Sequence, residues 1–438
     1  MKKRNVLIAG AAGRDYHNFL IKYKDNPYYD VKCFTAAQIP GIEKRKFPKK
    51  LAGRLYKKDI PIFSEYLLPE LIKKYDINNV VLSYSDLSHL DVMHKASLVL
   101  ANGANFILLG PQDTMIKSKK PVIAICAVRT GAGKSQTSRR IVDILRKNKK
   151  KVVVVRHPMP YGNLLKERWQ RFEKYEDLIK QKCTIEEHEE YDAWISRKVV
   201  VYAGVDYKEI LRRAEKEADV IVWDGGNNDF PFFKPDLLIT VADPFRAGHE
   251  LLYYPGETNF RMADVIIINK VNTSPKEGIK EIQKNIKIVN KNAIVIKANS
   301  VLISPTANII RNRKVIVVED GPTLTHGGMK YGAGYIIAMK YKAKIIDARE
   351  HAVGSIKEIF KKYPHLDGVL PAMGYSKVQI KELEATINKA VCDFVVDGTP
   401  TNLNRVIKVN KPIIDVDYEL KELGKVDLEK VLKKYKLI

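Results

Sequence analysis

The chain has 438 residues, which is too long for one compact core of ordinary size and predicts two or three domains. Its four scattered cysteines form no C-x-x-C pair, which argues against a disulfide framework or a thiolate zinc site and fits a reducing cytosol. The basic start is followed by only about five apolar residues, typical of a first strand and not of a signal peptide. No segment approaches the length of a membrane span, so we predict a cytoplasmic protein without a membrane partner.

The formal net charge of +25 favours attraction to anions, such as nucleic acid, an acidic membrane face or small polyphosphorylated metabolites. The basic residues are spread along the chain, and their densest run, at 43–58, falls in a predicted loop. A lysine-rich solvated surface, also typical of hot-adapted proteins, accounts for this pattern. We therefore do not favour nucleic acid as a partner.

Residues 1–118 alternate predicted strands and helices, which is typical of a doubly wound parallel sheet. The strands are expected at 6–9, 31–35, 80–84 and 106–109, with helices at 66–75 and 89–102. The turn after the first strand, G-A-A-G-R-D at 10–15, lacks the full G-x-G-x-x-G pattern. We expect a Rossmann-like domain without a dinucleotide, whose turn offers Arg14 and His17 to another anion.

A second domain is predicted at 119–312 and a C-terminal α/β domain at 313–438, because prolines and charges at 109–121 mark a boundary. The second has strands at 122–128, 151–156, 220–224, 237–242, 265–269 and 293–297 and a polar insertion near 158–207. Such an insertion is often a substrate loop. The C-terminal strands are expected at 315–319, 345–347, 368–371 and 394–397.

The stretch V-I-A-I-C-A-V-R-T-G-A-G-K-S at 122–135 runs a buried strand into a glycine-rich turn. This predicts a P-loop: glycine amides close around a polyphosphate, Lys134 reaches the outer phosphates and the Ser135 hydroxyl binds Mg²⁺. The full G-x-x-x-x-G-K-[ST] pattern has a glycine at the position where this chain has Val128. The predicted nucleotide-binding residues of the loop are Thr130, Gly131, Ala132, Gly133, Lys134, Ser135 and Gln136.

A second motif, A-D-V-I-V-W-D-G-G-N-N-D, places Asp224 at the end of another buried strand. A carboxylate there can hold Mg²⁺ through water, opposite Ser135, so these two residues form the predicted metal site. Asn227 and Asn228 follow and are predicted to orient a second substrate, although they also suit a plain polar turn.

The third motif is V-I-I-I-N-K-V-N, which ends at Asn272. In N-K-x-D the asparagine and aspartate grip guanine, but an amide in the fourth position cannot supply two acceptors. Asn269 and Lys270 are therefore predicted to contact the base, with ATP expected and GTP left open. A strand-end asparagine that caps the next helix is the plainer interpretation.

Several cationic residues follow the predicted strands, whose ends should meet at one crevice. We predict that Arg129 acts with Lys134 and Asp224 in catalysis and that a second group binds an anionic co-substrate. That substrate-binding group comprises Arg156, His157, Arg246 and His249 with the two asparagines. The glycine-rich segment 319–334, with Thr323, Thr325, His326 and Lys330, is typical either of an anion-binding lid or of a demanding surface turn.

Five motifs follow one another along the chain: R-T-G-A-G-K-S, V-V-R-H-P-M-P-Y-G, W-D-G-G-N-N-D, D-P-F-R-A-G-H-E and N-K-V-N. With these motifs in this order, the chain resembles the archaeal and bacterial cyclic 2,3-diphosphoglycerate synthetase-like P-loop proteins. The resemblance covers nearly the full length. It implies an ATP- and Mg²⁺-dependent ligase that closes 2,3-diphosphoglycerate into an internal phosphoanhydride.

The sequence thus predicts a three-part α/β enzyme that uses ATP on a small anionic phosphorylated acid, and it leaves a homodimer open. A regulatory or metallochaperone-type P-loop GTPase is the alternative, motivated by N-K-V-N and the Gly225-Gly226 pair. A basic nucleic-acid-binding protein with a relict loop is the third.

Overall fold

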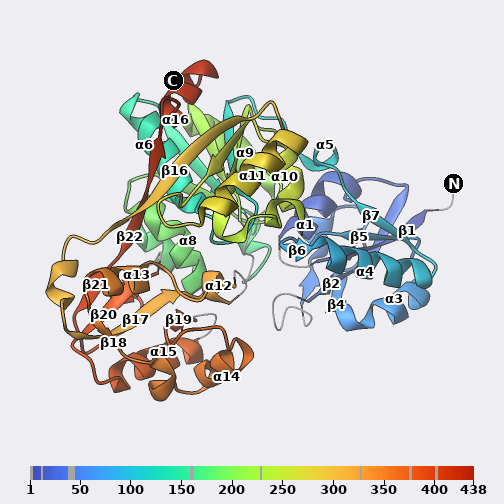
Figure 1. The fold of residues 1–438 in the computed structure, drawn as a ribbon. Helices are drawn as coiled ribbons and strands as arrows, with labels where there is room; N and C mark the ends of the chain where they lie inside the picture. Colours follow the sequence, from blue (N-terminus) through green and yellow to red (C-terminus); the bar gives the residue numbers. More distant parts are fainter. Residues whose placement is uncertain are drawn as a thin grey trace.

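Three mostly parallel sheets, each flanked by helices, build the chain (Figure 1). The computed structural model describes residues 3–10, 13–37, 45–157, 162–226, 229–325, 328–373, 377–399 and 403–438. The three sheets confirm the predicted doubly wound α/β class. None of the helices within these ranges is long and apolar enough to cross a membrane.

The first sheet defines the N-terminal domain and has the order β3-β4-β2-β1-β5-β7. All its neighbouring strands are parallel except β3 and β4. Because β2 lies on one side of β1 and β5 on the other, the strand order reverses at the carboxyl ends of β1 and β5. The strands are β1 (Arg4–Ala9), β2 (Tyr29–Ala36), β3 (Lys46–Phe47), β4 (Ile60–Ser64), β5 (Asn79–Leu82) and β7 (Asn105–Leu108), and the helices include α1 (Arg14–Asn18), α3 (Leu68–Lys74) and α4 (His89–Ala101).

The central sheet has nine strands in the order β10-β11-β9-β12-β8-β13-β15-β16-β22. Strand β8 (Val122–Ala127) lies in its middle and is buried along its whole length, as expected for a parallel strand covered on both faces. The other strands are β9 (Val152–Arg156), β10 (Gln170–Phe172), β11 (Val200–Ala203), β12 (Val220–Asp224), β13 (Leu237–Ala242), β15 (Val265–Ile268), β16 (Ile294–Ile303) and β22 (Asp417–Leu423). Helices include α6 (Lys134–Lys147), α9 (Tyr207–Glu217), α10 (Gly256–Met262) and α11 (Lys276–Val289).

Two segments extend this sheet beyond the strands expected from the sequence. The insertion contributes β10 and β11 at one edge, together with α7 (Tyr175–Lys180) and α8 (Ile185–Ile195). At the other edge β22 pairs antiparallel with β16, and α16 (Leu428–Lys434) adds Leu428, Val431 and Leu432 to the central core. The chain therefore returns from the C-terminal domain to the central sheet (Figure 1), where the predicted division placed everything after 312 in one part.

The C-terminal domain is built on a smaller parallel sheet in the order β18-β17-β20-β21, with β19 paired to the end of β17. Its strands are β17 (Lys314–Asp320), β18 (Lys344–Ile345), β19 (Leu370–Ala372), β20 (Phe394–Gly398) and β21 (Ile413–Asp415). Its helices include α12 (Gly321–Leu324), α13 (Ala333–Lys340), α14 (Ser355–Lys362) and α15 (Lys377–Lys389). The short α12 lies beside the phosphate loop of the central domain. A Cβ atom built on Gly131 of that loop would lie only 3.2 Å from Cγ2 of Thr323 in α12.

Candidate active site

The turn between β8 and α6 has the backbone of a phosphate-binding loop. Gly131 and Gly133 adopt φ values of 79° and 111°, which side chains other than glycine rarely accept. A Cβ atom at Gly133 would lie 2.0 Å from Nδ2 of Asn269, so this position also has no room for a side chain. Helix α6 begins at Lys134, and its N-terminus therefore faces the space above the loop.

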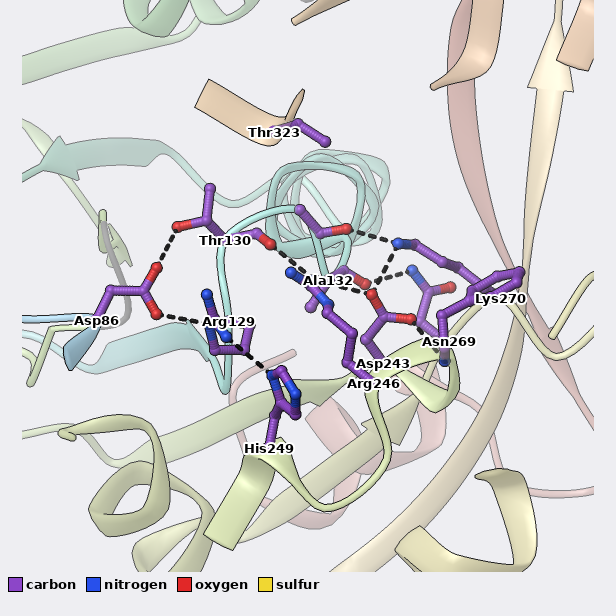
Figure 2. Close-up of polar contacts among 12 residues, drawn as sticks. Asp86, Arg129, Thr130, Ala132, Asp243, Arg246, His249, Asn269, Lys270 and Thr323 are labelled. Carbon is purple, nitrogen blue, oxygen red and sulfur yellow. Dashed lines mark hydrogen bonds and ion pairs between the residues drawn. The ribbon is translucent and has the colours of Figure 1, made fainter. Parts of the chain in front are cut away.

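Three side chains hold the carbonyl groups of this loop from one side (Figure 2). Arg246 donates to the carbonyl of Thr130 at 2.7 Å, Lys270 to that of Gly131 at 2.7 Å, and Asn269 to that of Ala132 at 3.0 Å. With the carbonyls tied back, the amides of the following residues point to the opposite side, as in an anion-binding nest. The loop is thus shaped for a polyphosphate.

Asp243, at the end of β13, organises two of these three side chains. Its Oδ2 accepts from Arg246 at 2.9 Å and from Lys270 at 3.0 Å. Burial alone would raise the pKa of Asp243, but the two cations hold it below its ordinary value. The carboxylate therefore stays charged and keeps both cations on the loop.

Asp224 forms the second charged centre of the site. Its Oδ1 accepts from Lys134 and from Ser138, each at 2.7 Å, and its Oδ2 accepts from Arg156. Arg156 also pairs with Glu190 of α8. Burial acts to raise the pKa of Asp224, but Arg156 and Lys134 hold it well below its usual range.

The N-terminal domain also contacts the loop, through Asp86. Its carboxylate pairs with Nε of Arg129 at 2.7 Å and accepts from the hydroxyl of Thr130 at 3.0 Å (Figure 2). Arg129 further donates to Nδ1 of His249 at 2.8 Å and lies 3.7 Å from the centre of the Tyr253 ring. Burial and Arg129 together lower the pKa of His249, so its ring is neutral and can accept this bond.

The structure brings most of the predicted site residues to one place. The wall of one cavity of about 1970 Å³ includes Arg129, Thr130, Gly131, Gly133, Lys134, Ser135, Gln136, Arg156, His157, Asp224, Arg246 and Lys270. Asn227, Asn228 and His326 lie outside the described residues. His157 packs against Gly226, and burial and Arg156 lower its pKa well below the ordinary value.

The two residues predicted to contact the base, Asn269 and Lys270, bond the phosphate loop in this structure. Asn269 is fully buried and bonded to the loop, and Lys270 reaches the loop carbonyl and Asp243. Asn272 donates to the carbonyl of Ser300 at 3.2 Å. In this structure the N-K-V-N motif therefore supports the phosphate loop and β16, and its contact with a base stays a prediction.

Sequence reasoning missed the acidic partners of the predicted cations. Asp86 and Glu190 come from the N-terminal domain and the insertion, and no local motif marks them. The predicted metal ligands Ser135 and Asp224 do not stand in a ligand cluster of their own: within the described ranges there is no group of three or more His, Cys, Asp or Glu side chains that could hold a metal. A P-loop magnesium ion takes most of its ligands from phosphates and water, so this arrangement suits it.

No family model matches the chain. Arginine synthetase ArcE of Thermococcus kodakarensis is 59% identical over 435 residues, which cover 99% of this chain and 97% of that protein. The chain belongs to the family of this synthetase. Cyclic 2,3-diphosphoglycerate synthetase of Thermococcus sibiricus is 24% identical over 454 residues, which cover 95% of this chain and 99% of that protein. It belongs to the same family and confirms the resemblance seen in the motifs. Both relatives are synthetases, so this member of the family is a P-loop ligase.

Among solved structures, the ATP complex of LpxK from Aquifex aeolicus aligns with a TM-score of 0.45 and 15% identity. The alignment covers 84% of this chain and 98% of that one. At this level the likeness carries no argument about ligands or activity.

Proposed function

We propose that this protein is an ATP- and Mg²⁺-dependent synthetase that forms arginine. The proposal is carried by the charge balance of the phosphate end of the cavity, together with the 59% identity to a protein named for that product. The three arginines predicted to act in catalysis or to bind the phosphorylated acid already face carboxylates. Arg129 faces Asp86, Arg246 faces Asp243, and Arg156 faces Asp224 and Glu190.

A substrate such as 2,3-diphosphoglycerate brings about five negative charges beside a triphosphate and needs uncompensated cations there. At the phosphate end of the cavity, carboxylates pair with Arg129, Arg156 and Arg246 before any substrate arrives. An amino acid has little net charge and does not need that surplus. The arrangement therefore favours an amino acid over a polyphosphorylated acid.

ATP and magnesium fit the residues present. The loop amides and the α6 N-terminus suit the phosphates, and the exposed Ser135 hydroxyl with Asp224 suits the metal. When bound, the metal ion neutralises charge on the outer phosphates. Lys134 would exchange its bond to Asp224 for the outer phosphates, while Arg156 keeps Asp224 charged. We propose ATP rather than GTP because Asn272, the fourth residue of N-K-V-N, has an amide that cannot supply the two acceptors that a carboxylate offers guanine.

General chemical principles give a two-step route by which ATP can drive the formation of arginine. The guanidinium group of arginine can form from the ureido group of citrulline. In the first step the ureido oxygen attacks the γ-phosphorus of ATP, and ADP leaves. Ammonia then adds to the activated carbon, the carbon–oxygen bond breaks, and inorganic phosphate carries the oxygen away. The loop and Lys134 would stabilise the transferred phosphoryl group, and the cavity walls would keep water from the activated intermediate.

The test is to incubate the purified protein with ATP, Mg²⁺, ammonia and citrulline, and to quantify arginine and ADP. Equal amounts of the two, dependent on citrulline and absent with Lys134→Met, support the proposal. The exposed Lys147, at the other end of α6, provides the matched control Lys147→Met. ATP consumption that is independent of amino acids contradicts it.

Closure of 2,3-diphosphoglycerate is the second candidate, because the relative named for it aligns with 95% of this chain. It predicts ADP formation that rises with 2,3-diphosphoglycerate and not with citrulline. Running both substrates in one assay separates the two functions directly.

A further inference from the structure

Helix α4, which covers one face of the N-terminal sheet (Figure 1), also exposes apolar side chains on the side away from that sheet. Val92 and Val99 are buried in the core between helix and sheet. On the outer side Leu90, Met93 and Leu100 are 66%, 59% and 59% exposed. A helix on the surface of a monomer normally carries polar residues there. Apolar side chains grouped in this way mark an interaction surface.

The stretch that continues from this helix has no charge. Although 29% of the chain is charged, residues 96–112 contain no Asp, Glu, Lys or Arg. They form the second half of α4, strand β7 and the start of α5 (Pro111–Thr114). Leu98 and Leu108 in this stretch are exposed as well. In a chain so rich in lysine, a surface without charges indicates a region that another molecule covers.

Strand β7 leaves an open edge beside the helix. Among the residues that the structure describes, β7 pairs with β5 and with no other strand. Edge strands are usually protected from further pairing by a lysine, a proline or a bulge. The sequence of β7 is N-F-I-L, and its register with β5 is regular, so it has none of these. Its free side can therefore accept another strand.

The exposed flank of α4 and the edge of β7 form one continuous face. Helix α4 connects β5 to β7 and packs beside α3 on its other flank. Its charged residues Asp91 and Lys95 lie on the flank toward α3, where Lys95 pairs with Glu65. At 3.6 residues per turn, Met93 and Leu100 project from the opposite flank. These two side chains therefore lie on the side of the open strand.

We propose that this face binds a second copy of the chain about a two-fold axis, with β7 of each copy pairing antiparallel with β7 of the other and the two α4 helices lying side by side. The net charge of +25 makes two copies repel each other wherever their lysine-rich surfaces approach. The uncharged face avoids this repulsion. An acidic partner would instead bind the basic surfaces. A two-fold axis presents the same strand edge from both copies, so their backbone groups match.

The size of the face fits a dimer. The exposed half of α4 is about 20 Å long and about 11 Å across, which gives roughly 350 Å². The edge of β7 extends it on one side. At the start of the helix the face continues onto the central domain, where Leu252 is 55% exposed and its carbonyl accepts from the amide of His89 at 2.9 Å. Stable interfaces bury about 600–1,000 Å² on each partner, which strand pairing and helix packing together can supply.

Symmetry determines which side chains meet. The centre of β7 lies about 7 Å from the start of the strand. At about 1.5 Å per residue, this is level with about residue 97 of the antiparallel α4. A two-fold axis through the centre of β7 would therefore pass near Ser97. It would place Met93 of one copy against Leu100 of the other, with the helix axes about 10 Å apart.

The mass of the purified full-length protein in solution is the first test. Light scattering at micromolar concentration should give twice the mass of one chain. Met93→Lys and Leu100→Glu should each weaken association about a hundredfold or more, because each change buries two unpaired charges in the dimer. Ile288→Glu is the matched control, since Ile288 is 67% exposed on α11 of the central domain, and it should leave the dimer intact.

Mixing the two charged variants tests the register. The new lysine of one copy would face the new glutamate of the other, so the mixture should form a heterodimer although each variant alone is monomeric. A heterodimer would also show that both variants are folded. Ser97→Cys gives an independent measurement, because two copies should form a disulfide across the axis under mild oxidation. Wild type, whose four cysteines are partly or wholly buried, is the control for that reaction.

Three results would overturn the proposal. The first is a wild type that stays monomeric, including one that instead binds vesicles of anionic lipid through this face. The second is a dimer that both charged variants leave intact, or one that Ile288→Glu dissociates to the same degree. The third is a mixture of Met93→Lys and Leu100→Glu that stays monomeric while Ser97→Cys forms no disulfide between copies.

Discussion

Carboxylates at the ends of buried strands behave in opposite ways in the central and C-terminal domains. Asp224 ends β12 and is held by Lys134 and Arg156, which keep its pKa well below the ordinary value despite burial. Glu319, near the end of β17, is equally buried, but it accepts from the amide of Tyr335 at 2.8 Å, and burial raises its pKa to about 7. Asp397 in β20 is bonded to Thr399, and burial likewise raises its pKa to about 7.

The comparison teaches that the same local pattern, an apolar strand ending in an acid, supports two kinds of site. Where cations face the acid it stays charged, and its partners can exchange when an anion arrives. Where mainly backbone amides and a hydroxyl face the acid, it holds a proton near neutral pH and serves to fix a turn. The following variants break or sharpen this difference.

The largest effect is expected from Lys134→Met, which removes the cation shared between Asp224 and the expected phosphates. Turnover should fall about 10²- to 10³-fold, because a positioned donor to the transferred phosphoryl group is lost. The unfolding free energy should change little, since Arg156 still faces Asp224. Steady-state kinetics together with denaturant unfolding check both points. Retention of more than half of the activity would sink the assigned role of the lysine.

Asp224→Asn should destabilise the central domain by about 3–5 kcal/mol, because the fully buried Arg156 then keeps only Glu190. The pKa of Asp224 is lowered by folding, so its stabilising contribution is present above its unfolded value of about 4 and is lost as pH falls below that. The difference between variant and wild type should therefore shrink in acid. Denaturant melts at several pH values measure this difference. A gap that stays constant down to pH 2 contradicts the ion-pair account.

The C-terminal acids should show the opposite pH dependence. Folding raises the pKa of Glu319 to about 7, so stability is greatest when the carboxyl is protonated and falls as pH rises from about 4.5 to about 7. The slope approaches about 1.4 kcal/mol per pH unit for each such group. Amide exchange in α13 between pH 5 and 8 measures the slope, and Glu319→Gln should reduce it whatever its effect on absolute stability. Asp397→Asn is the matched variant, and slopes unchanged by either would contradict the assignment.

The strands and the phosphate loop could be predicted because the information is local. A continuous apolar run identifies β8, and glycines at 131 and 133 identify the turn before α6. Asp224 follows from the same kind of run in β12. The class of fold and the meeting of these strand ends at one edge were therefore predictable.

Partners that are distant in sequence could not be predicted in this way. Glu190 faces Arg156 from an insertion, and β22 joins β16 after more than a hundred intervening residues. The contacts of the N-K-V-N motif with the loop were also beyond prediction from local sequence. Its asparagine and lysine side chains bond the loop carbonyls, and these bonds depend on the close approach of Asn269 to Gly133 and of Lys270 to Asp243.

The smallest kinetic effect is expected from Asp86, which tests whether the N-terminal domain positions the phosphate loop. Its carboxylate comes from that domain and contacts Arg129 and Thr130 of the loop. Asp86→Asn removes the charge that faces Arg129 and weakens the bond from Thr130. We expect kcat/KM for ATP to fall about tenfold, since the loop keeps its carbonyl contacts to Arg246, Lys270 and Asn269 but loses one charge-assisted partner.

The matched control for that variant is Asp113→Asn, which breaks an exposed pair with Lys22 elsewhere in the same domain. Exposed ion pairs contribute about 0–1 kcal/mol, so this control should leave the kinetics unchanged. Equal effects of the two variants would mean that the N-terminal domain acts only through its overall stability. A kinetic effect confined to Asp86→Asn would instead mean that this domain positions the loop through one carboxylate, as Asp243 does through Arg246 and Lys270.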